Sequence, residues 1–224
     1  MCIETENFDP AITLKEGFTI EAFNPGPLLS AMLEGGTFLA NEINRATEYS
    51  QNTLLEPLEE ASIAIPHLGR VKADEDFFFI CAMNPEELSG THRLSEALKD
   101  RIKVWIKLTY PQKSTELDII RINLPEQFMV EESELELIYS IIEETRKNEV
   151  DIEVPASIRA GIAIAKLLGR RRYLEEKGAI DEDGSVYTHL TDISKHVLLG
   201  SIKPKPGVKV ETVINRIINK TLGG

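Results

Sequence analysis

The chain has 224 residues, with 25 lysine and arginine against 37 aspartate and glutamate residues, and a formal net charge of −12. This acidic balance argues against a general nucleic-acid binder, because affinity for phosphate backbones comes mainly from clustered basic residues. No apolar run approaches the ~18 residues that a membrane helix needs. Two cysteines, Cys2 and Cys81, cannot form a disulfide scaffold, and the acidic N-terminus lacks signal-peptide features, so we expect a cytoplasmic protein.

Three apolar runs have the length and composition of buried strands. They cover residues 36–40, 76–82 and 103–108, and each ends where polar residues begin. This pattern is typical of parallel sheets, which carry their chemistry at the carboxyl ends of the strands. We therefore expect an α/β core that includes Trp105.

Between the first two runs, the sequence predicts a helix and a hairpin. Residues 47–60 have leucines at helical spacing, and Pro57 must bend or end this helix. Residues 63–71 have the pattern of a short hairpin.

After Pro111 the pattern is mostly helical. The expected helices cover residues 131–148, 157–168, 191–199 and 210–222. An extended link that begins near Gly200 separates the last two of them. We therefore expect two domains, an α/β core over residues 1–111 and an α-helical domain with a C-terminal tail over residues 112–224.

Three polar residues near the ends of apolar runs are candidates for chemistry, and each has an ordinary alternative. Glu42 can orient a water for attack as a general base, although acidic residues also cap strand ends in many folds. The amide of Asn84 can donate to a phosphate or a water, or it can start the turn at Pro85. Arg101 can present its guanidinium to a phosphate or pair within the chain with Asp100.

The blocks around these residues resemble, in order and spacing, those of the MoxR-type AAA+ ATPases. They are GPLL at 26–29 with GGTFLANEINRA at 35–46, LLEPLEE at 54–60, MNPEELSGT at 83–91 and LSEALKDR at 94–101. The resemblance extends from residue 8 to about residue 200. It implies a three-layer α/β core with a parallel sheet of the P-loop type, followed by an α-helical lid domain.

The resemblance also implies roles for single residues. Glu42 would be the Walker B glutamate that polarises the attacking water, and Asn84 would be sensor 1, which holds that water against the γ-phosphate. Arg101 would be an arginine finger supplied to a neighbouring subunit. The sequence SIRA at 157–160 is similar to the sensor 2 segment, so Arg159 would approach the phosphates of ATP; the alternative is a solvated arginine in the first turn of a helix.

Two features depart from the family pattern. Asn41 stands where the family has an aspartate, so the Mg²⁺ shell would receive one neutral oxygen in place of a charged one. The sequence contains no Gly-x-x-x-x-Gly-Lys-[Ser/Thr] motif, and we expect the chain to begin after that loop. The sheet would then lack the P-loop strand, leaving two apolar strand edges unpaired unless a segment such as residues 209–218 fills the gap.

The implied function is binding and hydrolysis of ATP with Mg²⁺, used by an oligomeric ring for chaperone-like remodelling or maturation of partner proteins. The absent Walker A motif and Asn41 predict that hydrolysis is impaired. Alternatives are a non-hydrolytic subunit that docks in an AAA+ ring and donates Arg101, or the remnant of a truncated gene. We expect no nucleic-acid or membrane partner. His67 and His92 lack neighbours at metal-ligand spacing, and we expect His189 and His196 to be surface histidines.

Overall fold

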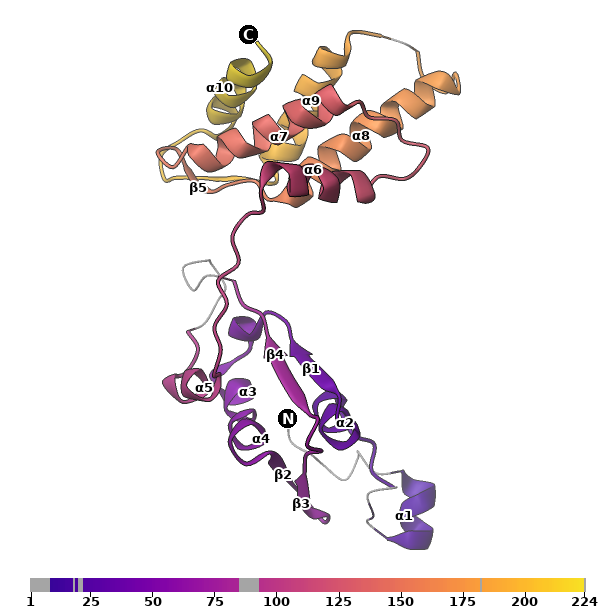
Figure 1. Ribbon diagram of the computed structural model, residues 1–224, viewed down its shortest axis with the longest axis vertical. Coiled ribbons are helices and arrows are strands. Elements are labelled where there is room, and N and C mark those ends of the chain that lie inside the picture. The colour runs from indigo at the N-terminus through magenta and orange to yellow at the C-terminus, as the bar shows by residue number, and fades with distance from the viewer. Residues whose placement is uncertain (1–8, 18, 20–21, 85–92, 182, 224) are drawn as a thin grey trace. The chain divides into compact units, whose positions relative to one another are not determined.

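The computed structural model describes residues 9–17, 19, 22–84, 93–181 and 183–223 (Figure 1). The chain divides into two compact units, Met1–Lys107 and Leu108–Gly224. Residues 2–8 and most of the block at 83–91 lie outside the described residues. None of the helices in the described ranges is both long enough and apolar enough to cross a bilayer.

A parallel pair of strands forms the centre of the first unit (Figure 1). Strands β1 (Thr37–Ala40) and β4 (Phe78–Cys81) run in the same direction, with Ala40 opposite Cys81. Two of the three expected strands, their parallel direction and the α/β class are thereby confirmed. Because the register is parallel, the residues that follow both strands lie at one edge of the sheet.

One face of this sheet is packed and the other is open. Phe79 packs against an apolar cluster that contains the fully buried Leu98. On the opposite face, the paired residues Leu39 and Ile80 are 59% and 43% exposed. The expectation that these strands are buried is therefore wrong for this face, because the described chain leaves its side chains in contact with solvent.

The third expected strand is absent. Residues 103–108 have no regular secondary structure, and Val104 and Ile106 are 73% and 78% exposed. A strand needs backbone hydrogen bonds from a neighbour, and no described segment provides them here. Trp105, expected in the core, is 53% exposed, and its indole nitrogen donates to the carbonyl of Ile102 at 3.1 Å.

The expected helix over residues 47–60 is two helices, α3 (Glu48–Asn52) and α4 (Leu55–Glu60). The break precedes Pro57, which lies in the first turn of α4, where its missing N–H removes no intrahelical bond. The hairpin is confirmed as β2 (Ser62–Ile65) paired antiparallel with β3 (Gly69–Lys72). The other described elements of this unit are α1 (Pro10–Glu16), α2 (Pro27–Glu34), the 3₁₀ turn η2 (Ile43–Arg45) and α5 (Glu96–Arg101).

The second unit is helical (Figure 1). Its helices are α6 (Lys113–Ile122), α7 (Glu132–Lys147), α8 (Ile158–Glu176), α9 (Val186–Leu199) and α10 (Val210–Leu222). A short antiparallel pair joins β5 (Ile152–Val154) to β6 (Lys203–Pro204).

In the helical unit, two helices have bounds other than those expected from the sequence, and residues 209–218 do not fill the gap in the sheet. Helix α8 continues through Gly169, where a Cβ would lie only 2.7 Å from the Cβ of Phe128, so this glycine allows close packing and does not end the helix. Helix α9 begins five residues earlier than expected, at Val186. Residues 209–218 do not form a strand, because the side chains of Val213 and Ile217 are buried on one side of α10.

A buried ion pair connects two helices of this unit. Arg146 on α7 donates two hydrogen bonds, of 2.8 and 2.6 Å, to the carboxylate of Glu116 on α6, which is 1% exposed. The guanidinium also lies 3.8 Å from the centre of the Tyr110 ring. Burial acts to lower the pKa of Arg146, but the hydrogen bonds and charge of Glu116 outweigh it and raise the pKa. Arg146 therefore stays charged at any physiological pH.

We expect Arg146→Met to lower the free energy of unfolding of the helical unit by about 3–5 kcal/mol, because Glu116 would be left buried without a partner. Urea unfolding followed by helical circular dichroism measures the change. The control is Lys203→Met, which removes the more exposed pair of Lys203 with Glu153 and should cost less than about 1 kcal/mol. Equal losses in the two variants would contradict the prediction.

Candidate functional site

The turn after β1 holds Glu42 in an unusual backbone conformation. Its φ of 53° and ψ of 43° are left-handed, a region that costs a non-glycine residue on the order of 1–2 kcal/mol. The amide of Ile43 donates to the carbonyl of Ala82 at 3.0 Å, which fastens this turn to the end of β4. The Glu42 side chain is 48% exposed, and one carboxylate oxygen lies 3.1 Å from Nε of Arg45. Surrounding contacts thus hold an accessible carboxylate at the carboxyl edge of the sheet.

Asn84 lies at the same edge. It is half-buried and follows β4, and its backbone carbonyl accepts a hydrogen bond of 2.9 Å from Nδ2 of Asn44. Asn41 is exposed in the turn between β1 and Glu42. The structure therefore brings Asn41, Glu42 and Asn84 to one sheet edge, because the strands before them are parallel and in register.

Arg101 is held elsewhere in the same unit. It is the last residue of α5, and its guanidinium pairs with Glu59 on α4 and donates to the carbonyl of Ala97 at 2.8 Å. The side chain is 23% exposed. The intrachain partner is thus Glu59 and not the neighbouring Asp100.

Arg159 belongs to the helical unit. It lies in the first turn of α8, as expected, and its side chain is exposed. Within the described ranges, no ion pair involves this guanidinium, so it is accessible to an anion in solution.

Two buried amides of the first unit were not identified from the sequence. Asn44 and Gln51 are both 0% exposed and hydrogen-bonded to backbone groups. Asn44 lies within the block at 35–46, but apolar periodicity gives no signal for a single buried polar residue. Only the structure shows which backbone groups these side chains contact.

The nucleotide and Mg²⁺ implied by the resemblance fit this edge only in part. A carboxylate and neutral amides are oxygen donors of the kind that surround Mg²⁺ and its waters. A basic side chain at this edge, Arg45, is already paired with Glu42. The sequence also offers no glycine-rich loop with its lysine. The edge therefore suits the positioning of a water and a metal shell better than the binding of a triphosphate.

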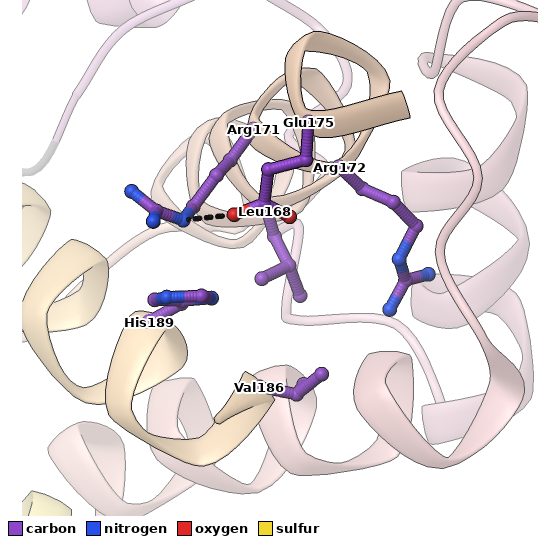
Figure 2. A pocket seen from close by; sticks show the side chains of 6 residues that line it. All are labelled: Leu168, Arg171, Arg172, Glu175, Val186 and His189. Atoms are coloured by element: carbon purple, nitrogen blue, oxygen red, sulfur yellow. Dashed lines mark ion pairs between the residues drawn. The ribbon is translucent and has the colours of Figure 1, made fainter. Parts of the chain in front are cut away.

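A small cavity lies in the helical unit, away from these residues in the chain (Figure 2). Its volume is about 20 Å³, and its lining consists of Leu168, Arg171, Arg172, Glu175, Val186 and His189. Nucleotide-sized ligands need roughly 300 Å³ or more, whereas this space suits a single water. It is therefore not a nucleotide site.

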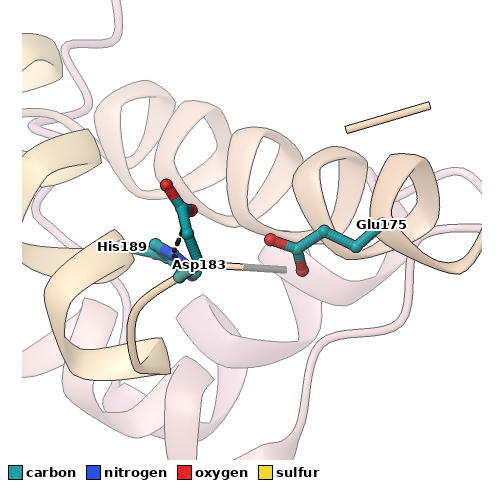
Figure 3. A group of neighbouring side chains, drawn as sticks. All are labelled: Glu175, Asp183 and His189. Atoms are coloured by element: carbon teal, nitrogen blue, oxygen red, sulfur yellow. Dashed lines mark hydrogen bonds and ion pairs between the residues drawn. The ribbon is translucent and has the colours of Figure 1, made fainter. Parts of the chain in front are cut away.

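Three potential metal ligands lie beside this cavity (Figure 3). Ligand atoms of Glu175, Asp183 and His189 are all within 4.8 Å of one another. However, Nε of Arg171 lies 2.9 Å from Glu175, and Arg171 also pairs with Asp183. Both carboxylates thus already pair with one guanidinium, so we interpret the group as an ion-pair network. His189, expected at the surface, is only 15% exposed because it packs into this network.

The backbone strain at Glu42 gives a prediction. Glu42→Gly should be more stable than Glu42→Ala by about 1 kcal/mol, because only glycine adopts this φ without steric cost. Denaturant unfolding of both variants measures the difference. The same comparison at the exposed helical residue Arg170 should give the opposite order, since glycine weakens a helix interior by about 0.5–1 kcal/mol relative to alanine.

Comparison with known proteins identifies relatives. Residues 13–104 match the family described as ATPase family associated with various cellular activities (AAA). YeaC of Bacillus subtilis (strain 168), described as an uncharacterized protein, is 26% identical over 220 residues, covering 88% of this chain and 67% of YeaC.

Two further relatives carry functional names. Gas vesicle ATPase GvpN of Haloferax mediterranei is 31% identical over 144 residues, which cover 62% of this chain and 40% of GvpN. Chaperone MoxR1 of Mycobacterium tuberculosis is 35% identical over 96 residues, which cover 42% of this chain and 24% of MoxR1. The chain therefore spans less than half the length of either of these two relatives.

Proposed function

We propose that this chain is a MoxR-type AAA+ ATPase, because residues 13–104 match the AAA family and its relatives include GvpN and MoxR1. It works in an oligomeric ring in the cytoplasm that uses Mg·ATP for chaperone-like remodelling or maturation of partner proteins. The observation that carries the proposal is the placement of Glu42 beside the end of β4, in a strained conformation at the carboxyl edge of a parallel sheet. Strain of this kind persists where neighbouring structure imposes it and is concentrated at functional sites.

Each candidate residue has its own role in the proposed hydrolysis of ATP. Glu42 accepts a proton from the attacking water, and the amide of Asn84 holds that water in line. Asn41 would contribute an amide oxygen to a Mg²⁺ shell. In the helical unit, the exposed guanidinium of Arg159 would bind a phosphate. Mg²⁺, when bound with ATP, supplies Lewis-acid stabilisation of the charge that develops on the phosphate oxygens.

Arg101 acts on a different nucleotide. Its α5 helix holds it beside Glu59, and a guanidinium released toward a neighbouring subunit stabilises transition-state charge there. Turnover by these 224 residues alone is low, because they include no Walker A motif and a neutral amide replaces the metal-shell aspartate at Asn41. The neutral amide of Asn41 also favours a second candidate, a non-hydrolytic ring subunit whose contribution is Arg101.

Arg101 is tested in a mixed assay with a MoxR-type subunit that carries a Walker A motif. We expect Arg101→Ala to lower ATP turnover of the mixture by roughly a thousandfold or more, because one transition-state cation is lost. Glu59→Gln is the matched control, since it breaks the same ion pair but leaves the guanidinium, and turnover should persist. If both variants reduce turnover equally, Arg101 is a structural partner of Glu59 and the arginine-finger role is wrong.

Asn41 is tested in a chimaera in which this chain follows the Walker A segment of such a subunit. Asn41→Asp should raise turnover by roughly tenfold or more, because a charged oxygen strengthens the metal shell. The dependence on Mg²⁺ concentration should shift to lower values in the same variant. A matched change at an exposed site away from the sheet edge, Asn52→Asp, should alter neither quantity. Unchanged turnover in Asn41→Asp would show that the neutral amide does not limit hydrolysis.

A further inference from the structure

Two amide side chains are fully buried in the first unit. Asn44 directly follows Ile43, and Gln51 lies three residues before Leu54. Ile43 and Leu54 are buried in the apolar cluster that also contains Leu98 of α5. Buried amides are costly unless their polar atoms are hydrogen-bonded. Their partners therefore indicate what the amides hold in place.

Asn44 joins the turn after β1 to the end of β4. Its Nδ2 donates to the carbonyl of Asn84 at 2.9 Å. Its Oδ1 is buried and accepts no hydrogen bond from the described residues. An apolar side chain at this position would leave no buried acceptor unpaired. The advantage of asparagine over an apolar residue is therefore its hydrogen bond to the carbonyl of Asn84.

Gln51 joins the same turn to α5. Its Nε2 donates to the carbonyl of Ala46 at 3.0 Å, and its Oε1 accepts from the amide of Ser95 at 3.3 Å. Ser95 is the N-cap of α5, where its hydroxyl accepts from the amide of Leu98 at 3.2 Å. Gln51 thus connects the end of the Glu42 turn to the N-cap of the helix that carries Arg101.

These contacts form one continuous path. It runs from Asn84 through Asn44 and the turn that contains Glu42 to Ala46, then through Gln51 to Ser95 and along the six residues of α5. The helix is too short to be rigid without tertiary support. Its N-terminal end is fixed by the Gln51 bond and its C-terminal end by the pair of Arg101 with Glu59.

We propose that Asn44 and Gln51 are positioning residues that link the nucleotide-facing edge, Glu42 and Asn84, to the placement of Arg101. This inference rests on the proposed function. A movement at the sheet edge shifts the Ala46 carbonyl, and Gln51 transmits that shift to the start of α5. The amides are therefore part of the communication between one nucleotide site and the next.

The first experiment measures amide hydrogen exchange in the full chain and needs no ATP. Gln51→Met keeps the length of the side chain and removes both polar atoms. We expect exchange in residues 96–101 to become roughly tenfold faster, with no comparable change in β2 and β3. The control is Ser194→Ala, which removes another fully buried polar group whose oxygen has no hydrogen-bond partner among the residues that the structure describes. Unchanged exchange in α5, or a uniform increase across the first unit, would overturn the link.

The second experiment uses the mixed-subunit ATPase assay. Gln51→Met and Asn44→Leu should each lower turnover by roughly tenfold without raising KM for ATP, because misplacing Arg101 or Asn84 affects the transition state. Asn44→Leu also removes the unpaired Oδ1, so its thermal midpoint should stay within about 4 °C of the unmodified chain. A purely structural role predicts instead that turnover falls only with stability, and turnover at the unmodified level in Asn44→Leu would overturn the proposal.

The two proposals fail in different ways. If Arg101→Ala leaves turnover intact, the arginine-finger role fails, while faster exchange in α5 under Gln51→Met still supports the physical link. If Arg101→Ala abolishes turnover but both amide variants retain it, the proposed function stands and the positioning role is overturned.

Discussion

The parallel pairing of β1 with β4 is the constraint on which the candidate site depends. Its register sets Ala40 opposite Cys81, so the segments after both strands meet at one edge. The hydrogen bonds from Ile43 to Ala82 and from Asn44 to Asn84 continue the pairing beyond the last strand residues. These attachments fix the turn that contains Glu42 to the end of β4, and they sustain its left-handed conformation.

The helical unit depends on a different interaction. Its apolar core is non-directional, and many arrangements of amphipathic helices would bury a similar area. The bidentate pair of Glu116 with Arg146 has a defined geometry, because neither charge is tolerated in the interior without the other. Tyr110 covers the guanidinium, so the residue at the entrance to the unit also contributes to this fixed geometry.

Much of the fold follows from the sequence, and the failures have physical causes. Helices such as α7 and α10 were predictable because their apolar residues repeat with the period of a helix. Residues 103–108 have the composition of a strand, but composition cannot supply a neighbouring strand, and the segment stays exposed. At the site, Glu42 and Asn84 were predictable from their places after apolar runs. Gln51 was not, because its role depends on contacts with Ala46 and Ser95 that only the fold creates.

Arg101 has two roles in this account: it pairs with Glu59 within its own subunit, and it is proposed to act as an arginine finger on a neighbouring one. Its pair with Glu59 is partly exposed, with 55% of the Glu59 side chain in contact with solvent, so breaking it costs no more than about 1 kcal/mol. The Nε of Arg101 is buried without a hydrogen-bond partner among the described residues, which further lowers the stability of this side-chain conformation. An arginine that stabilises a phosphoryl-transfer transition state contributes roughly 4 kcal/mol or more. The Arg101–Glu59 pair can therefore fix the position of Arg101 within its own subunit, and it is weak enough to break when Arg101 contacts the nucleotide of a neighbouring subunit.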